Sequence, residues 1–293
     1  WQNSLSPVNT KDKETKMFVI PKGSGISAIS DDLKEQGLIR DSLVFSLYVR
    51  KNGIDKKIQA GDFKLAPSMS SQQIAKALTM ASKDIWITIP EGKRAEEIAE
   101  ILQENVPTYD DSWVARLQEN EGFLFPDTYL VPRDASIDQI ITLLTSTFDQ
   151  KYSTISNNTT LSKAEIATLA SLIEREAITN EEKPMISGII HNRIKEGMPL
   201  QIDATIQYAK GRPGRWWEPV SASEYKSVKS LYNTYLRQSL PPGPIGNAGL
   251  EALAAAANPS DTDYFYYLHD KNQNIRYAKT NDEHINNIEK YGL

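Results

Sequence analysis

The chain contains no cysteine, and it therefore has no disulfide, no thiol nucleophile and no thiolate metal site. Histidine is scarce: His191, His269 and His284 are widely separated, and the H-E-x-x-H spacing of zinc sites does not occur. The glycine-rich phosphate-binding motifs and the G-x-S-x-G motif of many serine hydrolases are missing as well. We therefore expect no metal ion and no other cofactor.

Neither long apolar runs nor basic clusters occur in the sequence. A membrane-spanning helix needs at least about 18 consecutive apolar residues, and no run of that length is present. The 33 Lys and Arg residues are outnumbered by 38 Asp and Glu residues, and they form no basic stripe. Because phosphate binding depends on concentrated positive charge, we expect no nucleic-acid partner.

The length and composition are those of a globular protein with more than one module. Hydrophobic residues make up 40% of the 293 residues and charged residues 24%, an ordinary balance for two or three folded modules. Residues 1–16 are polar, and we interpret them as a linker or stalk. We place an N-terminal module at residues 17–82 and a larger domain at residues 83–293.

An internal repeat marks the first third of the chain. Ile20-Pro21-Lys22-Gly23 and Ile89-Pro90-Glu91-Gly92 are each followed by apolar residues nine and thirteen positions after the Ile. Each copy predicts a strand, a turn and a helix, and a further helix is expected from about Asp41 to Asn52. The order strand, helix, helix, strand is that of a LysM-like module, although a small packing domain without a ligand fits equally well.

The rest of the chain mixes helices and strands without a regular βαβ alternation, which favours an α+β fold. Ser162-x-x-Glu165 is a capping box, so a helix should begin there and run to about Ala177. The other expected elements are helices at 138–152, 180–197, 250–257 and from 281, and a hairpin of strands at 264–268 and 275–278.

Carboxylates in the helix at 162–177 are the best candidates for chemistry. Glu174 and Glu176 project about 160° apart on this helix, so one cleft cannot easily use both. Glu176 has the bulkier apolar neighbours on the helical wheel, and such surroundings raise a carboxyl pKa towards the range of a general acid. The alternative is that both are solvated side chains, paired with Arg175 or Lys183.

Several motifs together carry more information than periodicity. In chain order they are Glu121–Tyr129 (EGFLFPDTY), Ala170–Glu176 (ASLIERE), His191–Ile194 (HNRI), Leu200–Asp203 (LQID), Tyr232–Tyr235 (YNTY), Leu240–Ile245 (LPPGPI) and Ala254–Pro259 (AAAANP). With these motifs in this order, the chain resembles the YceG-like family of endolytic murein transglycosylases over roughly residues 17–293.

The resemblance implies a LysM-like βααβ module followed by a mixed α+β catalytic domain. It also implies cleavage, without water, of the β-1,4 bond between N-acetylmuramic acid and N-acetylglucosamine, which leaves 1,6-anhydro ends and limits the length of nascent strands. The implied partners are peptidoglycan glycan strands and peptidoglycan synthases. The family is tethered at the outer face of the bacterial cytoplasmic membrane by an N-terminal helix, which is not among these residues.

The resemblance also assigns roles to particular residues. Glu176, the second acidic residue of an E-[KR]-E triplet, is the implied catalytic acid and base. The implied substrate-contacting residues are Gln201, Asp203, Tyr232, Asn233, Thr234 and Tyr235. Trp216 and Trp217 either provide a stacking platform for sugars or pack onto the core.

Two other functions remain open at this stage. A true hydrolase would need a second carboxylate besides Glu176, for which Asp203 and Asp127 are the motif-associated choices. A non-catalytic protein would use the LysM-like module to bind glycan and to act as a scaffold for wall synthesis.

Overall fold

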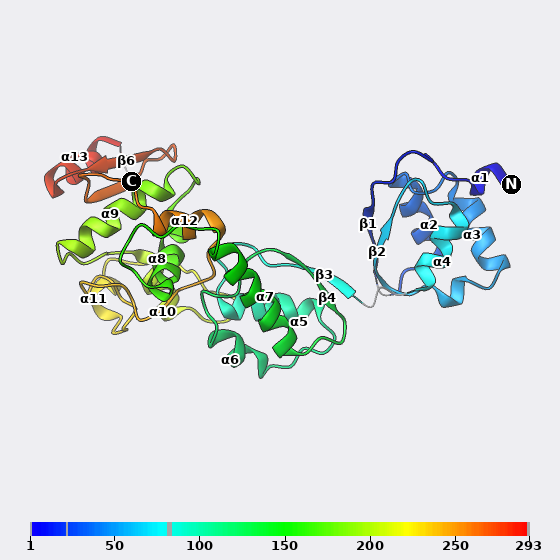
Figure 1. Ribbon diagram of the computed structural model, residues 1–293, viewed down its shortest axis with the longest axis horizontal. Coiled ribbons are helices and arrows are strands. Elements are labelled where there is room, and N and C mark those ends of the chain that lie inside the picture. Colours follow the sequence, from blue (N-terminus) through cyan, green and yellow to red (C-terminus); the bar gives the residue numbers. More distant parts are fainter. Residues whose placement is uncertain (1, 22, 81–83, 292–293) are drawn as a thin grey trace. The chain divides into compact units, whose positions relative to one another are not determined.

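The computed structural model describes residues 2–21, 23–80 and 84–291, which form two compact units (Figure 1). The first unit contains the chain up to Ile87 together with Tyr129–Ala135, and the second contains Thr88–Thr128 and the chain from Ser136 onward. Helices combine with two-stranded sheets in the described residues, so the expected α+β fold is confirmed. No described helix is long and apolar enough to cross a membrane.

The first unit follows the order that the repeat predicts. Its elements are α1 (Gln2–Leu5), β1 (Lys16–Ile20), α2 (Ile26–Glu35), α3 (Ser42–Lys51), the short 3-10 helix η1 (Asp55–Lys57), β2 (Gly61–Leu65) and α4 (Ser71–Thr79). β1 and β2 pair antiparallel with Phe18 opposite Phe63. In Figure 1 the helices α2, α3 and α4 lie beside this two-stranded sheet.

The repeat positions build the core of this unit. A cluster of buried residues from positions 18 to 78 packs together here; they are Phe18, Ile20, Ile29, Leu33, Leu38, Ile39, Phe45, Val49, Phe63, Leu65, Ile74, Ala75 and Leu78. Gly23 and Gly92, which close the turns of the two repeat copies, have φ angles of 88° and 74°. Only glycine adopts this left-handed conformation freely, which explains why both copies carry it.

The polar N-terminal segment makes contacts with the first unit along part of its length. Leu5 is buried, and the Arg40 guanidinium donates hydrogen bonds to the carbonyl oxygens of Pro7 and Val8. The backbone N–H of Asn9 donates to the carbonyl of Pro67 at 3.0 Å. Part of the expected linker is therefore packed against this unit.

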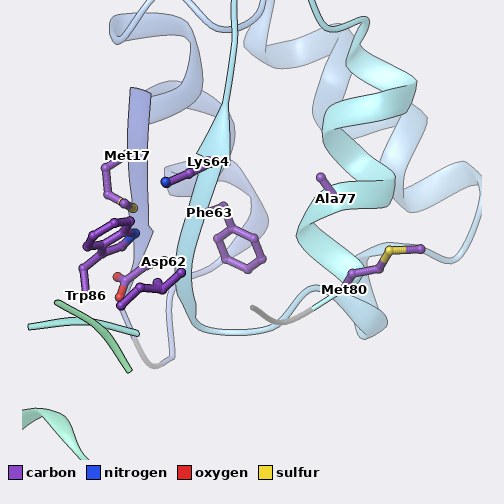
Figure 2. Close-up of a pocket in the computed structure, with 8 residues that line it drawn as sticks. Met17, Asp62, Phe63, Lys64, Ala77, Met80 and Trp86 are labelled. Atoms are coloured by element: carbon purple, nitrogen blue, oxygen red, sulfur yellow. The ribbon is translucent and has the colours of Figure 1, made fainter. Parts of the chain in front are cut away.

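A largely apolar pocket of about 310 Å³ lies on the first unit (Figure 2). It is lined by Met17, Asp62, Phe63, Lys64, Ala77, Met80, Trp86 and Leu130. The Lys64 ammonium lies 4.4 Å from the centre of the Trp86 ring, a cation–π contact that covers part of this aromatic surface.

The remaining elements follow in chain order. They are β3 (Asp84–Thr88), α5 (Ala95–Asn105), α6 (Trp113–Gln118), β4 (Thr128–Pro132), α7 (Ile137–Tyr152), α8 (Lys163–Glu176), α9 (Lys183–Lys195), α10 (Asp203–Lys210), α11 (Glu224–Ser227), α12 (Leu250–Ala257), β5 (Tyr266–His269), β6 (Ile275–Ala278) and α13 (Asn281–Tyr291). β3 pairs with β4, and β5 pairs antiparallel with β6 as the predicted hairpin.

Helix α8 is the centre of the second unit. The capping box is present: the backbone N–H of Ser162 donates to Glu165 Oε2 at 2.8 Å, and the Ser162 hydroxyl accepts from the backbone of Glu165. Every residue from Ile166 to Ile173 is buried, so the helix is enclosed on all sides and not only along one stripe. It packs against α9 and the alanine-rich α12 (Figure 1).

A glycine in α9 allows the chain beyond α12 to approach closely. A Cβ atom at Gly188 would lie 2.2 Å from the carbonyl oxygen of Ser260, so no larger residue fits there. The Ser260 N–H donates to the carbonyl of Pro184 at 2.9 Å. This contact fixes the start of the segment that leads to β5.

Glu121 joins three segments of the second unit through hydrogen bonds. The backbone N–H of Ala95 donates to its Oε2 at 3.0 Å, and the Asn247 amide donates to its Oε1 at 2.8 Å. The Oδ1 atom of Asn247 in turn accepts from the N–H of Leu124 at 2.8 Å. Burial raises the pKa of Glu121 to about 7, although the hydrogen bond from Ala95 works in the opposite direction.

Glu121 should make the protein more stable at pH 5 than at pH 8. A raised pKa in the folded state contributes stability that is fully present below the reference pKa of 4.5 and is lost as pH rises through about 7. The loss between the two pH values is roughly 2 to 3 kcal/mol. Urea denaturation at both pH values measures it, and Glu121→Gln, which stays neutral, should reduce the difference. An unchanged pH dependence in the variant would rule out this origin.

Candidate active site

A pocket of about 230 Å³ opens at the C-terminal end of α8, in the second unit. The residues that line it are Glu176, Arg193, Leu200, Gln201, Tyr235, Tyr266, Tyr267, Asn281 and His284. They come from α8, α9, β5, α13 and two connecting segments, so residues distant in sequence meet here. The lining offers one carboxyl group, one guanidinium and several hydroxyl and amide groups, which suits a ligand rich in hydroxyls.

Glu176 is the last residue of α8 and lies in the wall of this pocket. The Tyr267 hydroxyl donates a hydrogen bond to its Oε2 at 2.7 Å. The backbone becomes extended at Ala177, so the helix ends directly at the acid. Part of the side chain remains accessible from the pocket, while the surrounding protein removes most of its hydration.

The pKa of Glu176 is raised above its ordinary value. Burial is the main cause, and the negative charge of Asp203 adds to it, whereas the hydrogen bond from Tyr267 and the charges of His269 and Arg175 oppose it. The partial negative charge at the C-terminal end of a helix also disfavours the carboxylate. The direction agrees with the expectation from the helical wheel, but the pocket neighbours are aromatic and polar instead of aliphatic.

Glu174 belongs to a different environment, as the 160° separation predicted. Its Oε1 accepts from Lys183 Nζ at 2.9 Å, and its Oε2 accepts from the backbone N–H of Gly249 at 3.0 Å. Both members of this ion pair are nearly buried, with side-chain exposures of 10% for Glu174 and 5% for Lys183. Glu174 therefore joins α8 to α9 and to the start of α12, and it does not line the pocket.

Arg193 contributes a positive charge to the pocket wall. Its side chain is 8% exposed, with Nε donating to the carbonyl of Phe265 at 2.6 Å and Nη1 donating to the carbonyl of Leu200 at 2.7 Å. The guanidinium carbon lies 5.0 Å from the centre of the Tyr266 ring. Arg193 thus ties α9 to both β5 and the segment that carries Gln201.

Three of the predicted substrate-contacting residues lie at or beside the pocket. Gln201 and Tyr235 line it, and the Tyr235 hydroxyl donates to Asp203 Oδ1 at 2.5 Å. Gln201 has a φ angle of 55°, a left-handed conformation that is uncommon for residues other than glycine. Strained backbone of this kind often occurs at functional sites.

Asn233 and Thr234 support the pocket wall from behind. Both are almost fully buried, and neither lines the pocket in this conformation. Asn233 Oδ1 accepts from the N–H of Tyr235 at 2.9 Å, and Thr234 accepts from the N–H of Ile202 at 3.0 Å and lies 3.0 Å from the Thr205 hydroxyl. These bonds position Gln201 and Tyr235. The geometry of Asn233 and Thr234 therefore favours a supporting role over the expected direct contact with substrate.

Tyr232 also lies outside the pocket lining. Its ring packs against Tyr208 with 4.8 Å between ring centres, and it borders the hydrophobic core of the second unit. Of the six predicted substrate-contacting residues, the structure therefore brings Gln201, Asp203 and Tyr235 together near Glu176, whereas the other three do not line the pocket.

The two tryptophans are engaged with other side chains. Trp217 donates from Nε1 to Glu97 at 2.8 Å, and the Arg175 guanidinium lies 3.9 Å from its ring centre. Trp216 donates to Glu100 at 2.9 Å. These contacts favour the packing role over a free stacking platform. Asp127 is exposed, accepts from the N–H of Thr128, and does not line the pocket.

Sequence reasoning missed several residues that form the pocket. They are Arg193, Tyr266, Tyr267, Asn281 and His284. The sequence does contain signals for some of them, because Arg193 is part of the HNRI motif and the two tyrosines are part of an aromatic-rich strand. These residues line the pocket only because β5 lies beside the end of α8, and no local sequence pattern specifies that position.

Comparison with known proteins identifies the family. The sequence profile of the YceG-like family matches residues 18–290. The chain belongs to the YceG-like family. The resemblance found in the motifs is thereby confirmed, and it extends over nearly the whole chain.

Two named relatives and a solved structure agree with this membership. A Bacillus subtilis protein named endolytic murein transglycosylase is 31% identical over 98% of this chain and 88% of its own length. A Streptococcus pneumoniae protein of the same name is 28% identical over 99% of this chain, which spans only 60% of that relative. The crystal structure of a YceG-like protein from Listeria monocytogenes matches 94% of this chain and 99% of its own, with 30% identity and a TM-score of 0.66.

Proposed function

We propose that the chain is an endolytic murein transglycosylase, the activity stated in the names of its Bacillus and Streptococcus relatives. The observation that carries the proposal is the carboxyl group of Glu176, whose pKa is raised by burial and which lies in the wall of a polar, tyrosine-rich pocket. A raised pKa increases the protonated fraction of a carboxyl group near neutral pH, and the protonated form can act as a general acid.

In the proposed reaction Glu176 acts twice. As the neutral acid it gives its proton to the glycosidic oxygen that leaves C1 of the muramyl residue. As the carboxylate it then takes the proton of the C6 hydroxyl of the same residue, whose oxygen bonds to C1. The product is a 1,6-anhydro end, and no water is consumed. One carboxyl group serves both steps, unlike the paired carboxylates of ordinary glycosidases.

The pocket residues support this scheme through their hydrogen-bonding groups. Gln201, Tyr235 and Asn281 can bond sugar hydroxyls, and the faces of Tyr235 and Tyr266 suit the apolar faces of pyranose rings. The attack by the C6 hydroxyl is intramolecular, so correct positioning of the sugar strongly favours it over attack by bulk water.

A hydrolase is the rival enzyme. Asp203 is the candidate second carboxylate, because its charge already acts on Glu176, but its Oδ1 accepts a hydrogen bond from Tyr235. Asp127 is a weaker choice since it does not line the pocket. A glycan-binding scaffold is the rival without catalysis.

Digestion of purified peptidoglycan distinguishes these functions. A transglycosylase should release fragments whose new muramyl ends are non-reducing and lighter than hydrolysed ends by one water, as measured by mass spectrometry. Cuts inside strands should produce fragments longer than one disaccharide from the outset. Reducing muramyl ends would indicate a hydrolase with a second carboxylate, and binding without any fragments would indicate a scaffold.

We further propose that residues 17–82 are a LysM-like module and residues 83–293 the catalytic domain. The order β1, α2, α3, β2 and a buried cluster drawn from residues 18–78 support a separate module. If this module binds glycan, a fragment of residues 17–82 should pellet together with insoluble peptidoglycan. A fragment that stays in the supernatant would argue against glycan binding. Because murein lies outside the cytoplasmic membrane, we propose an extracytoplasmic location; the N-terminal membrane anchor, the limit on strand length and the synthase partners stay predictions.

A further inference from the structure

Tyr267 makes a direct contact with the proposed catalytic group. Its hydroxyl donates to Oε2 of Glu176 at 2.7 Å, although the two residues are 91 positions apart in the chain. Burial and the negative charge of Glu176 raise the pKa of Tyr267 well above its ordinary value. The phenol therefore keeps its proton, and remains a donor, at neutral and mildly alkaline pH.

The strand that carries Tyr267 is held from two sides. In the β5–β6 hairpin Tyr267 lies opposite Tyr277, and Leu268 lies opposite Arg276. Arg193 of α9 donates to the carbonyl of Phe265, directly before β5, at 2.6 Å. The hydroxyl is thus presented by a strand that is paired on one side and fixed to the pocket wall at its start. A donor on such a rigid element can hold a carboxyl group in one orientation.

The two oxygens of Glu176 differ in their surroundings. Oε2 accepts from Tyr267, whereas no residue in the described part of the chain donates a hydrogen bond to Oε1. We propose that Tyr267 is a positioning residue, which holds Oε2 and leaves Oε1 to exchange the proton with the substrate. This inference rests on the proposed function of Glu176.

The hydrogen bond from Tyr267 also lowers the pKa of Glu176 and so opposes the effect of burial. Burial and Asp203 favour the protonated carboxyl group, whereas the donor Tyr267 favours the carboxylate that must take the C6 proton in the second step. The other charged or titratable groups that act on Glu176 or line its pocket are His269 of β5, Arg175 of α8, Arg193 of α9, Tyr235 and Tyr266 of the pocket wall, and His284 of α13. The hydrogen bond to Glu176 comes from Tyr267 and not from any of these groups.

Tyr267→Phe tests the proposal because it removes the hydroxyl and keeps the ring. We expect kcat to fall by about tenfold to a hundredfold with little change in KM. The pKa of Glu176 should rise further, so the high-pH limb of the activity profile should move to higher pH. Tyr277→Phe is the matched control, since Tyr277 lies opposite in the same hairpin and stacks on Tyr264 instead of contacting Glu176.

A second variant keeps the fold and changes the hydrogen bond in the other direction. A 3-fluorotyrosine in place of Tyr267 is a stronger donor of nearly the same shape, so the high-pH limb should move to lower pH. A wild-type profile in both variants, or a loss of kcat without any movement of the limb, would overturn the proposal. A wrong assignment of the proposed function would give a different result, because the wild-type protein itself would then release no anhydro ends from peptidoglycan.

Discussion

Glu176→Gln is expected to lower the rate of glycan cleavage by at least about a hundredfold, the usual scale for loss of a general acid. The amide has the shape of the carboxyl group and can still accept the hydrogen bond from Tyr267 through its carbonyl oxygen. Folding and glycan binding should therefore persist while both proton transfers are lost. The release of anhydro-muropeptides from peptidoglycan, with melting temperature as the check on folding, measures the effect.

Two controls test whether the loss is specific to position 176. Glu196→Gln makes the same substitution at the exposed end of α9 and should leave the rate unchanged. Glu174→Gln should cost far less activity per folded molecule than Glu176→Gln, because Glu174 does not line the pocket. Equal losses at 174 and 176 would remove the assignment of Glu176 as the acid and base.

Lys183→Met is expected to lower the free energy of unfolding by about 3–5 kcal/mol, the usual result of breaking a buried ion pair from one side. Lys183 and Glu174 are nearly buried, and the variant leaves the Glu174 carboxylate without its cation. Glu91 is close to the same group, and its pKa is raised by burial and by the charge of Glu174. In the variant, the charge of Lys183 no longer offsets the electrostatic repulsion between Glu91 and Glu174. Urea denaturation at neutral pH measures the loss.

The double variant Lys183→Met with Glu174→Gln should recover part of this stability. It removes both charges, and the glutamine carbonyl can still accept from the N–H of Gly249. Lys163→Met is the surface control, because its ion pair with Asp149 is half-exposed and should contribute less than about 1 kcal/mol. A single variant at Lys183 that is as stable as the control would show that the buried pair adds nothing.

Local patterns predicted most of the elements for identifiable reasons. The repeat positions that precede and begin α2 and α5 are spaced as strand, turn and helix, and Ile29 and Ile98 are both buried. The capping box located the start of α8 because both of its hydrogen bonds lie within four consecutive residues. The separation of Glu174 from Glu176 also followed from the geometry of one helix. Each of these interactions depends on neighbours in the chain.

The sequence by itself therefore determined the α+β class, the approximate limits of α3, α7, α8, α12 and the β5–β6 hairpin, the family, and Glu176 as the residue to examine. Only the tertiary structure decided what surrounds that residue. Tyr267 reaches Glu176 across 91 positions, and Thr234 reaches Ile202 across 32. Such contacts depend on how elements pack, and helical or strand periodicity reports only which face of an element is buried. For the same reason a motif could indicate Asn233 and Thr234 as part of the site without showing that they support it from behind.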